Sequence, residues 1–325
     1  IHGIIIYVLM VKGCKMMGYI IIDLEFNNMQ SITKYYPKIY DEYAEIKNLS
    51  IDNEIIEIGA VKLNKFMQKI DEYKTYIKPE AFKILNPKIT EITGITEKDL
   101  ETGKNFKSAM DELKSFVGEN QIICSWATDD IVHIIDNANY HNYKNIQWIK
   151  EYLDIQEYCT KILAHKKVLS LKNALDELKI KVDKSKLHDA LNDANYTAEV
   201  FKRLYNNKIV KNYIVKDVYN MPSIRIKELK KYNIESYNID FLCPKCNIEV
   251  DREHPLRLFS WRFLSLGKCP KCNHKLLQEV VLKKTLSDEV VFNKVNSILS
   301  DIEYMDMAYK FKRAQNHSNN KVNKL

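Results

Sequence analysis

The first strongly hydrophobic stretch of the chain predicts a buried strand that runs into acidic residues. Residues 19–22 (YIII) are continuously apolar, which is typical of a central strand covered on both faces, and LEFNN follows the first acid. Because side chains alternate along a strand, Asp23 and Glu25 are expected to point to the same side. Two unpaired carboxylates there would repel each other and would be costly to desolvate. Either the strand has reached solvent, or the acids belong to a divalent cation site that needs more acids from elsewhere.

The pattern then alternates between strands and helices. Strands are predicted at 54–63, at 74–79 and from 121, a loop with a short helix at 86–96, and helices at 105–118, 131–140, 169–180 and within 188–206. A polar, tyrosine-rich insertion is expected between Asn27 and Asn53. Strands that come first and then alternate with helices predict a three-layer α/β domain with a mixed sheet, over residues 17–207.

The remaining chain predicts a linker, a cysteine module and a tail. Residues 208–240 are rich in Lys, Tyr and Asn, and predict a connecting arm with a short helix at 223–232. A small cysteine module is expected at 241–282. Residues 283–325 predict a terminal helix or helices that end in a polar segment, QNHSNNKVNKL, with the composition of a disordered tail.

Composition and charge narrow the class of protein. A chain of 325 residues that is 46% hydrophobic can form one large domain with an appendage or two domains, and it is not wholly disordered. The formal charge of +7 favours partners that carry negative charge, nucleic acid among them. Residues 1–15 lack the features of a signal peptide and are expected to be upstream sequence before a start at Met16 or Met17. No stretch predicts a membrane span, so we expect a cytoplasmic protein.

Further acids follow in positions that could complete a cation site. Asp130 comes just after a second buried strand, IICSW, and next to Asp129. Asp193 lies on a predicted helix with a stripe of small residues that would allow close approach to the sheet: Ala190, Ala194 and Ala198. On a continuous helix His188 and Asp193 would point about 140° apart. His188 is therefore expected in the loop that enters the helix, free to reach the same site.

The set of Asp23, Glu25, Asp130, Asp193 and His188 resembles the active site of the DEDD superfamily of 3′-5′ exonucleases, in its DEDDh (DnaQ-like, RNase T-type) branch. The matching motifs are DLEF, SWATDD and HDALNDA, and EIIEIGAVKL and ITEITGIT are also similar to sequences of that family. The resemblance covers residues 18–204 and implies a ribonuclease H-like mixed sheet flanked by helices. The family's spacing from Trp126 favours Asp130 over Asp129. The long segment after DLEF resembles the KapD-like and Eri1-like subgroup.

This resemblance implies a metal-dependent 3′-5′ exonuclease that releases nucleoside 5′-monophosphates. Hard carboxylates suit Mg²⁺ or Mn²⁺, and two such ions about 4 Å apart would hold the attacking and leaving oxygens of an in-line displacement. Asp23 is expected to bridge both ions, the other three acids to complete their coordination, and His188 to act as the general base. By resemblance Leu24 and Phe26, or their backbone, contact the terminal nucleotide; Phe26 could equally pack in the core.

Subgroup resemblance favours RNA or short single strands over duplex DNA as the substrate. A function of a different class is a catalytically silent exonuclease fold that binds nucleic acid or regulates another protein. The intact set of four acids and His188 argues against that alternative. A metal phosphohydrolase site at His188-Asp189 is a weaker interpretation, because the other histidines offer no convincing set of further ligands: His133, His141 and His165.

Four of the seven cysteines form a metal-binding pattern. CPKCN and CPKCNH give two C-x₂-C pairs separated by 22 residues, formed by Cys243, Cys246, Cys269 and Cys272. This spacing predicts a zinc ribbon with one structural zinc ion, because four thiolates leave no open coordination position; a redox role is the alternative. Basic and aromatic residues alternate between the two pairs: Arg252, Arg257, Phe259, Trp261, Arg262, Phe263 and Lys268. They could stack on bases and pair with phosphates, or they could form the core of the ribbon.

Overall fold

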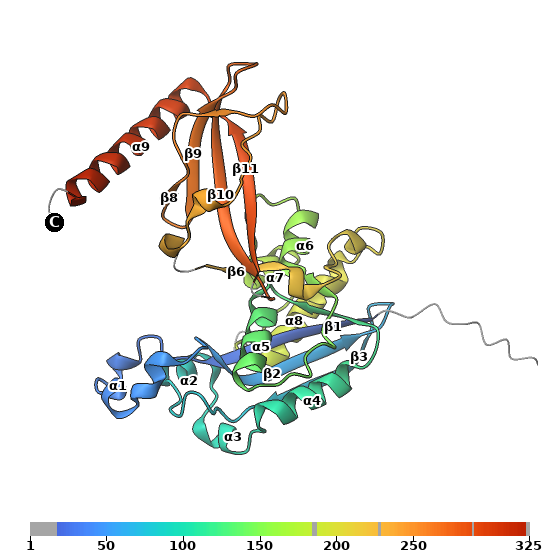
Figure 1. Ribbon diagram of the computed structural model, residues 1–325. Helices are drawn as coiled ribbons and strands as arrows, with labels where there is room; N and C mark the ends of the chain where they lie inside the picture. The colour runs from blue at the N-terminus through green and yellow to red at the C-terminus, as the bar shows by residue number, and fades with distance from the viewer. Residues whose placement is uncertain (1–17, 184–186, 227–228, 288, 323–325) are drawn as a thin grey trace, which may run out of the picture. The chain divides into compact units, whose positions relative to one another are not determined.

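The computed structural model of the chain describes residues 18–183, 187–226, 229–287 and 289–322. Figure 1 shows the order of its helices and strands. Contacts within the chain separate two units, of which the first ends at Met221 and the second begins at Pro222. The boundary expected near Asn207 thus falls inside the first unit. No helix among the described residues combines the length and the apolar character that crossing a bilayer requires.

The first unit is built on a five-stranded mixed sheet whose middle strand is the apolar run near the start of the chain. In spatial order the strands are β3 (Lys69–Tyr76), β2 (Glu54–Leu63), β1 (Gly18–Asn27), β4 (Gln121–Ser125) and β5 (Tyr152–Asp154). β1 is antiparallel to β2 and parallel to β4. Ile20, Ile21 and Ile22 are at most 1% exposed, so the predicted central strand is covered on both faces.

Helices cover both faces of this sheet (Figure 1). α8 (Ala190–Leu204) packs on the face that carries Ile21 and Val61. α4 (Phe106–Val117) packs on the other face, where Phe116 stacks on Tyr73 of β3. The other helices of this unit are α1 (Ile39–Glu42), α2 (Pro87–Thr93), α3 (Glu97–Glu101), α5 (Asp129–Tyr140), α6 (Ile155–Ile162) and α7 (Leu171–Glu177). The layers confirm the predicted α/β class and its mixed sheet.

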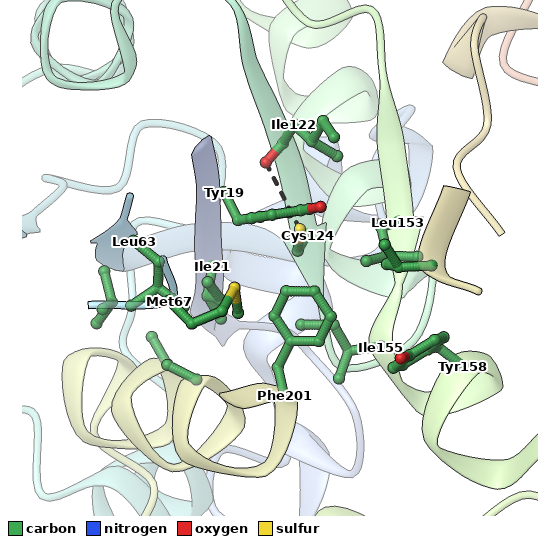
Figure 2. Close-up of a cluster of buried hydrophobic side chains, with 14 of the residues drawn as sticks. Tyr19, Ile21, Leu63, Met67, Ile122, Cys124, Leu153, Ile155, Tyr158 and Phe201 are labelled. Atoms are coloured by element: carbon green, nitrogen blue, oxygen red, sulfur yellow. Dashed lines mark hydrogen bonds between the residues drawn. The ribbon is translucent and has the colours of Figure 1, made fainter. Parts of the chain in front are cut away.

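α8 approaches the sheet closely because the facing residues are small. The predicted stripe of Ala190, Ala194 and Ala198 is buried. A Cβ atom on Gly59 of β2 would lie 2.2 Å from the backbone of Ala190 and Leu191, so no side chain fits there. Farther along the helix the packing partners are larger, and Figure 2 shows Phe201 against Tyr19 and Ile21. The start of α8 is therefore held directly against β2.

Buried polar residues fix the end of β1 and the insertion that follows it. The insertion forms two 3₁₀ helices, η1 (Ile32–Lys34) and η2 (Ala44–Asn48), around α1. Asn27, fully buried at the end of β1, donates to the carbonyl of Ile84 and accepts from the backbone N–H of Asn86. The buried carboxylate of Glu54 accepts three backbone N–H bonds, from Glu80, Ala81 and Phe82. These bonds order the loop that lies beside the strand ends.

Residues 208–221 belong to the first unit and not to a linker, which corrects the sequence prediction. They include two 3₁₀ helices, η4 (Val210–Asn212) and η5 (Val218–Asn220). Tyr152 of β5 and Val215 exchange two backbone hydrogen bonds, of 2.9 and 2.8 Å. Val210 is fully buried in the core beneath α8. The segment is polar overall, but a few of its apolar residues pack in the core or pair with the edge strand β5.

The second unit contains a sheet in which β11, β10, β9 and β7 are neighbours, with β6 paired to β10 and β8 to β9. Its strands are β6 (Pro222–Arg225), β7 (Asp251–Arg252), β8 (Arg257–Phe259), β9 (Arg262–Lys268), β10 (Lys275–Thr285) and β11 (Val290–Ile298). Two 3₁₀ helices, η6 (Leu229–Lys231) and η7 (Ile234–Ser236), precede the cysteines. Leu229, Ile234 and Ile239 lie in the core of this unit, so residues 229–239 are also part of a fold and not an arm.

Two helix predictions are wrong in this unit. Residues 223–225 of the expected short helix lie in the strand β6 (Pro222–Arg225), and β11 occupies part of the expected helical tail. β11 pairs with β10 from Val290 to Ile298 without a break, because it is rich in the β-branched and aromatic residues that suit a strand. The later part of the expected tail forms α9 (Asp301–Val322), which continues through residues 315–322 of the segment expected to be disordered. Its Phe311 is fully buried against Leu264 and Leu266.

Candidate active site

Asp23 and Glu25 lie on the face of β1 that α8 covers. The register with β2 places Asp23 opposite Gly59 and Glu25 opposite Glu57. Both acids are half-buried. A bulge follows Glu25, and it ends the regular alternation at Phe26. The prediction that both acids share one side of the strand is confirmed.

Asp130 reaches the same place from the first turn of α5. The pairing of β1 with β4 ends at Ile21, so the β1 backbone beyond it is free to bond elsewhere. The backbone N–H of Leu24 lies at the carboxyl of Asp130 and, together with Ser125, partly offsets the rise of its pKa. Asp130 is half-buried, whereas its neighbour Asp129 is exposed. Of the two adjacent acids, it is Asp130 that the structure turns toward Asp23.

The start of α8 brings Asp193 and His188 to these acids. Asp193 lies in the first turn, and Asp189 caps the helix by accepting the N–H of Asn192 at 3.0 Å. His188 precedes the cap with a φ of 63°, and its N–H donates to Asp193 Oδ2 at 3.1 Å. Donor atoms of Glu25, His188 and Asp193 all lie within 4.8 Å of one another. The predicted position of His188 in the loop before the helix is confirmed.

The acids raise one another's pKa values because they are crowded and partly desolvated. Burial, and then the charges of Asp130 and Asp193, raises the pKa of Asp23 well above its ordinary value. Burial and the charge of Glu57 raise the pKa of Glu25 to about 8. Burial and the charge of Asp129 likewise raise the pKa of Asp130 to about 8. Such a cluster is unfavourable unless protons or cations neutralise it.

The donor set fits hard divalent cations. Asp193 Oδ1 is buried without a hydrogen-bond partner among the described residues, and the carboxylate of Asp193 lies beside the donors of Glu25 and His188. Carboxylate oxygens are the ligands that Mg²⁺ and Mn²⁺ prefer. A cation here would satisfy the unpartnered oxygen and remove the repulsion between the acids.

Leu24 and Phe26 differ in how they relate to this cluster. The side chain of Leu24 points to the opposite face of β1 and is only 5% exposed, so it packs in the core. Only its backbone reaches the acids, through the bond to Asp130. Phe26 is half-buried and meets His133 of α5 edge to face, with ring centroids 4.7 Å apart.

A buried ion-pair network beside the acids was missed from the sequence. Glu57 is 1% exposed. The ammonium group of Lys74 on β3 lies 2.6 Å from Glu57 Oε1 and also contacts the carboxylate of Asp189. The other oxygen of Glu57 accepts the N–H of Ala190 at 3.1 Å. A charged residue within the apolar run IIEIGAV is the signal that could have pointed to it.

This network connects the sheet to the turn that positions His188 and Asp193. Like charges opposite each other on neighbouring strands are destabilising, and Glu57 lies opposite Glu25. Lys74 compensates for that repulsion and, by also binding Asp189, ties the helix cap to the sheet. Glu57, Lys74 and Asp189 therefore act as positioning residues rather than as ligands.

The four patterned cysteines form a cluster in the second unit. Three pairs of sulfur atoms are 3.3 to 3.6 Å apart: Cys243 with Cys272, Cys246 with Cys269, and Cys246 with Cys272. A tetrahedral zinc ion with Zn–S bonds of about 2.3 Å would place its sulfurs ~3.8 Å apart, whereas a disulfide needs about 2.0 Å. The backbone N–H of Cys272 lowers the pKa of Cys269 to about 6, whereas the neighbouring thiol of Cys269 raises the pKa of Cys246 to about 12. The cluster fits one metal ion.

Comparison with known proteins gives the family. A model of the family RNase_T, described as "Exonuclease", matches residues 20–201, just over half of the chain. The DNA polymerase III PolC-type of Thermotoga maritima is 34% identical over 158 residues, which are 46% of this chain and 10% of that protein. The chain thus spans about a tenth of the length of this relative.

Two further relatives match over longer stretches. The DNA polymerase III subunit epsilon of Buchnera aphidicola subsp. Schizaphis graminum is 25% identical over 225 residues, which are 66% of this chain and 86% of that protein. The ERI1 exoribonuclease 2 of Xenopus laevis is 23% identical over 175 residues, which are 46% of this chain and 25% of that protein.

Substitution of Lys74 by Met tests the positioning network. It leaves two carboxylates without their counter-charge, so we expect the free energy of unfolding to fall by about 2 kcal/mol, less than for a fully buried pair. Mn²⁺ binding, measured by calorimetry, should weaken about tenfold as the turn at His188 loosens. Lys74→Arg should restore much of both. Lys69→Met, which removes an exposed lysine of the same strand, is the control. Equal effects of the Lys74→Met and Lys69→Met substitutions would contradict the role.

The raised pKa values predict how pH and metal affect stability. Glu25 has an ordinary pKa of 4.5 and a folded value of about 8, so the folded state binds the proton more tightly. The metal-free protein should therefore lose stability as pH rises from about 4.5 through about 8. We expect its Tm to fall by on the order of 5 °C more than that of Glu25→Gln over this range. Mg²⁺ should raise Tm more at about pH 8.5 than at about pH 5; equal metal effects at both would contradict this account.

Proposed function

Because the chain belongs to the RNase_T exonuclease family, in its DEDDh branch, we propose that it is a metal-dependent 3′-5′ exonuclease. The reaction is hydrolysis of the terminal phosphodiester bond, which releases a nucleoside 5′-monophosphate. The observation that carries the proposal is the convergence of four acids and a histidine from β1, α5 and α8. These residues are Asp23, Glu25, Asp130, Asp193 and His188.

The residues of this chain divide the catalytic work. Asp23, Glu25, Asp130 and Asp193 would hold two divalent cations, Mg²⁺ or Mn²⁺. Such ions, when bound, supply positive charge to the attacking and leaving oxygens of the phosphodiester. His188 is exposed and is held outside α8 by its own turn. From there its ring takes a proton from the attacking water and can pass it to solvent.

We propose single-stranded nucleic acid as the substrate, with RNA favoured over DNA. The similarity to ERI1 exoribonuclease 2 and the long insertion after DLEF support RNA. The similarity to two DNA polymerase III proteins supports DNA as the competing substrate. RNA and DNA oligomers of one sequence, compared at equal concentration, would decide between them by their kcat/KM values.

The cysteine cluster is proposed to hold one structural zinc ion. All four thiols belong to the second unit, whereas the acids proposed to perform the chemistry belong to the first. The small core around them contains Phe241, Val250 and Leu276. This core is too small to order the two C-x₂-C segments without a metal. The zinc therefore stabilises the second unit and takes no part in hydrolysis.

Substitution of the two adjacent acids before α5 gives a matched test of the catalytic set. Asp130→Asn removes a proposed ligand and should abolish hydrolysis, while Asp129→Asn should leave the rate within about twofold because Asp129 is exposed. His188→Ala should keep Mn²⁺ binding and lose ~10²–10⁴-fold in kcat. Oligomers labelled at the 3′ or the 5′ end, with Mg²⁺ or Mn²⁺, measure both the rate and the direction. Full activity of Asp130→Asn would exclude the proposed site.

Substitution of one cysteine tests the structural role of zinc. Cys243→Ser should lower the zinc content from about one ion per chain and should lower the melting temperature of the second unit. Hydrolysis of a trinucleotide should be unchanged, because all proposed catalytic residues lie in the first unit. Elemental analysis, thermal unfolding and trinucleotide turnover give the three readouts. Loss of trinucleotide turnover would show that the zinc module contributes to the chemistry.

A further inference from the structure

The net charge of the chain resides entirely in its second unit. Residues 222–325 contain 19 Lys and Arg against 12 Asp and Glu, a net charge of +7, whereas residues 1–221 contain 31 of each sign. The unit with the acidic cluster is therefore neutral overall. A polyanion is attracted by summed charge, so the second unit is the part of the chain that a nucleic acid strand is expected to favour.

One face of the second unit's sheet is divided between a helix and an open groove. The register of β9, β10 and β11 places alternate residues of each strand on this face. α9 covers one end of it, where Phe311 packs on Leu264 and Leu266. Farther along, the same face forms a groove of about 320 Å³. The groove is lined by Ile226, Trp261, Val281, Lys283, Asn293 and Val295, with Glu279 at its side.

Trp261 is the most conspicuous side chain of this groove. Its indole is 56% exposed, although a tryptophan gains more than most residues from burial. The guanidinium of Arg262 lies over the indole, 5.2 Å from the ring centroid, and is itself paired with Glu279. The ring is therefore supported on one side by a fixed cation and is presented to the groove as a flat surface.

The structure separates the basic and aromatic residues that alternate in the sequence between the cysteine pairs. Phe263 lies in the core of the unit and Phe259 packs on Phe311. Arg252 donates to the carbonyl of Ile239 and to the side chain of Gln278. These residues hold the ribbon together. Trp261 remains at the groove with Arg262 over its ring, and Lys283 supplies a positive charge in the groove itself.

We propose that this groove docks single-stranded nucleic acid, with one base stacked on Trp261 and an adjacent phosphate paired with Lys283. The proposal rests on the proposed function. It specifies a second surface, which binds a part of the strand that is not being cleaved. Its volume lies at the low end for small-ligand sites and admits one base with its sugar. The exposed amide of Asn293 can donate to or accept from a base edge, and Val281 and Val295 contact its apolar surface. Aromatic stacking and a nearby cation form the usual platform for a single strand.

Binding by the full chain, made catalytically silent by Asp130→Asn, tests the groove. The probe is a fluorescein-labelled single strand of about 20 nucleotides, followed by polarisation at several salt concentrations. Trp261→Ala should raise Kd by about tenfold, within the range for loss of one stacked base. Lys283→Ala should lower the log–log salt slope by roughly 0.7. The control is Tyr309→Ala, which removes an exposed aromatic residue of α9 in the same unit and should leave Kd unchanged.

Tryptophan fluorescence gives a second readout, which can be measured with an aromatic ring still present at position 261. The other two tryptophans, Trp126 and Trp148, have buried indole nitrogens. Addition of the unlabelled strand should therefore quench mainly Trp261, and Trp261→Phe should remove most of the quenching while a stacking ring remains. Unchanged Kd in Trp261→Ala, or quenching that persists in Trp261→Phe, would overturn the docking surface.

Trinucleotide hydrolysis by the active chain separates this proposal from the proposed function. A trinucleotide occupies the active site without needing a second docking surface, so Trp261→Ala should hydrolyse it at the parent rate. Absence of hydrolysis by the parent chain would count against the exonuclease and leave the binding measurements to judge the groove. Normal hydrolysis by the parent together with unaltered strand binding by Trp261→Ala and Lys283→Ala would overturn the groove alone. A protein ligand would then be the occupant to seek.

Discussion

The contact of α8 with β2 at Gly59 is the constraint on which the candidate site depends. Because Gly59 has no side chain, the backbone of Ala190 lies directly against the strand, and Glu57 can accept the helix's first N–H. This contact sets the height of the first turn of α8 above the sheet. Asp193 and His188 belong to that turn and its loop, so their distance from the acids of β1 follows from it. A larger residue at Gly59 would displace these groups together.

The same close packing brings several carboxylates together, and the fold pairs only some of them with a cation. Glu25 and Glu57 lie opposite each other on the neighbouring strands β1 and β2. Asp23, Asp130 and Asp193 lie beside them. Lys74 balances Glu57 and Asp189, which serves the positioning side of the cluster. The four remaining acids have no such lysine among the contacts described. Their mutual repulsion is the free energy that bound cations would relieve, so affinity for metal and instability without it have the same source.

The sequence predicts what depends on local periodicity, and it does not predict what depends on tertiary pairing. Alternation along β1 placed Asp23 and Glu25 together, and the helical angle placed His188 outside α8. Glu57, Lys74 and Asp189 are distant in the sequence and meet only through the register of β2 with β3 and the packing of α8. β11 was mistaken for a helix because its Val and Phe residues could suit either structure, and only its partner β10 decides. The buried residues of 208–240 were hidden by a polar composition.

The separation of charge between the two units is compatible with the chemistry proposed for the acids. A lysine placed near unpaired carboxylates binds them, as Lys74 binds Glu57 and Asp189. More cationic side chains around Asp23 and Asp193 would compete with metal ions for the same oxygens. Phosphate-binding charge is therefore compatible with the catalytic cluster only if it is located elsewhere. A neutral first unit and a basic second unit would meet both requirements of the proposed function, because the first could gather cations while the second attracts the polyanion.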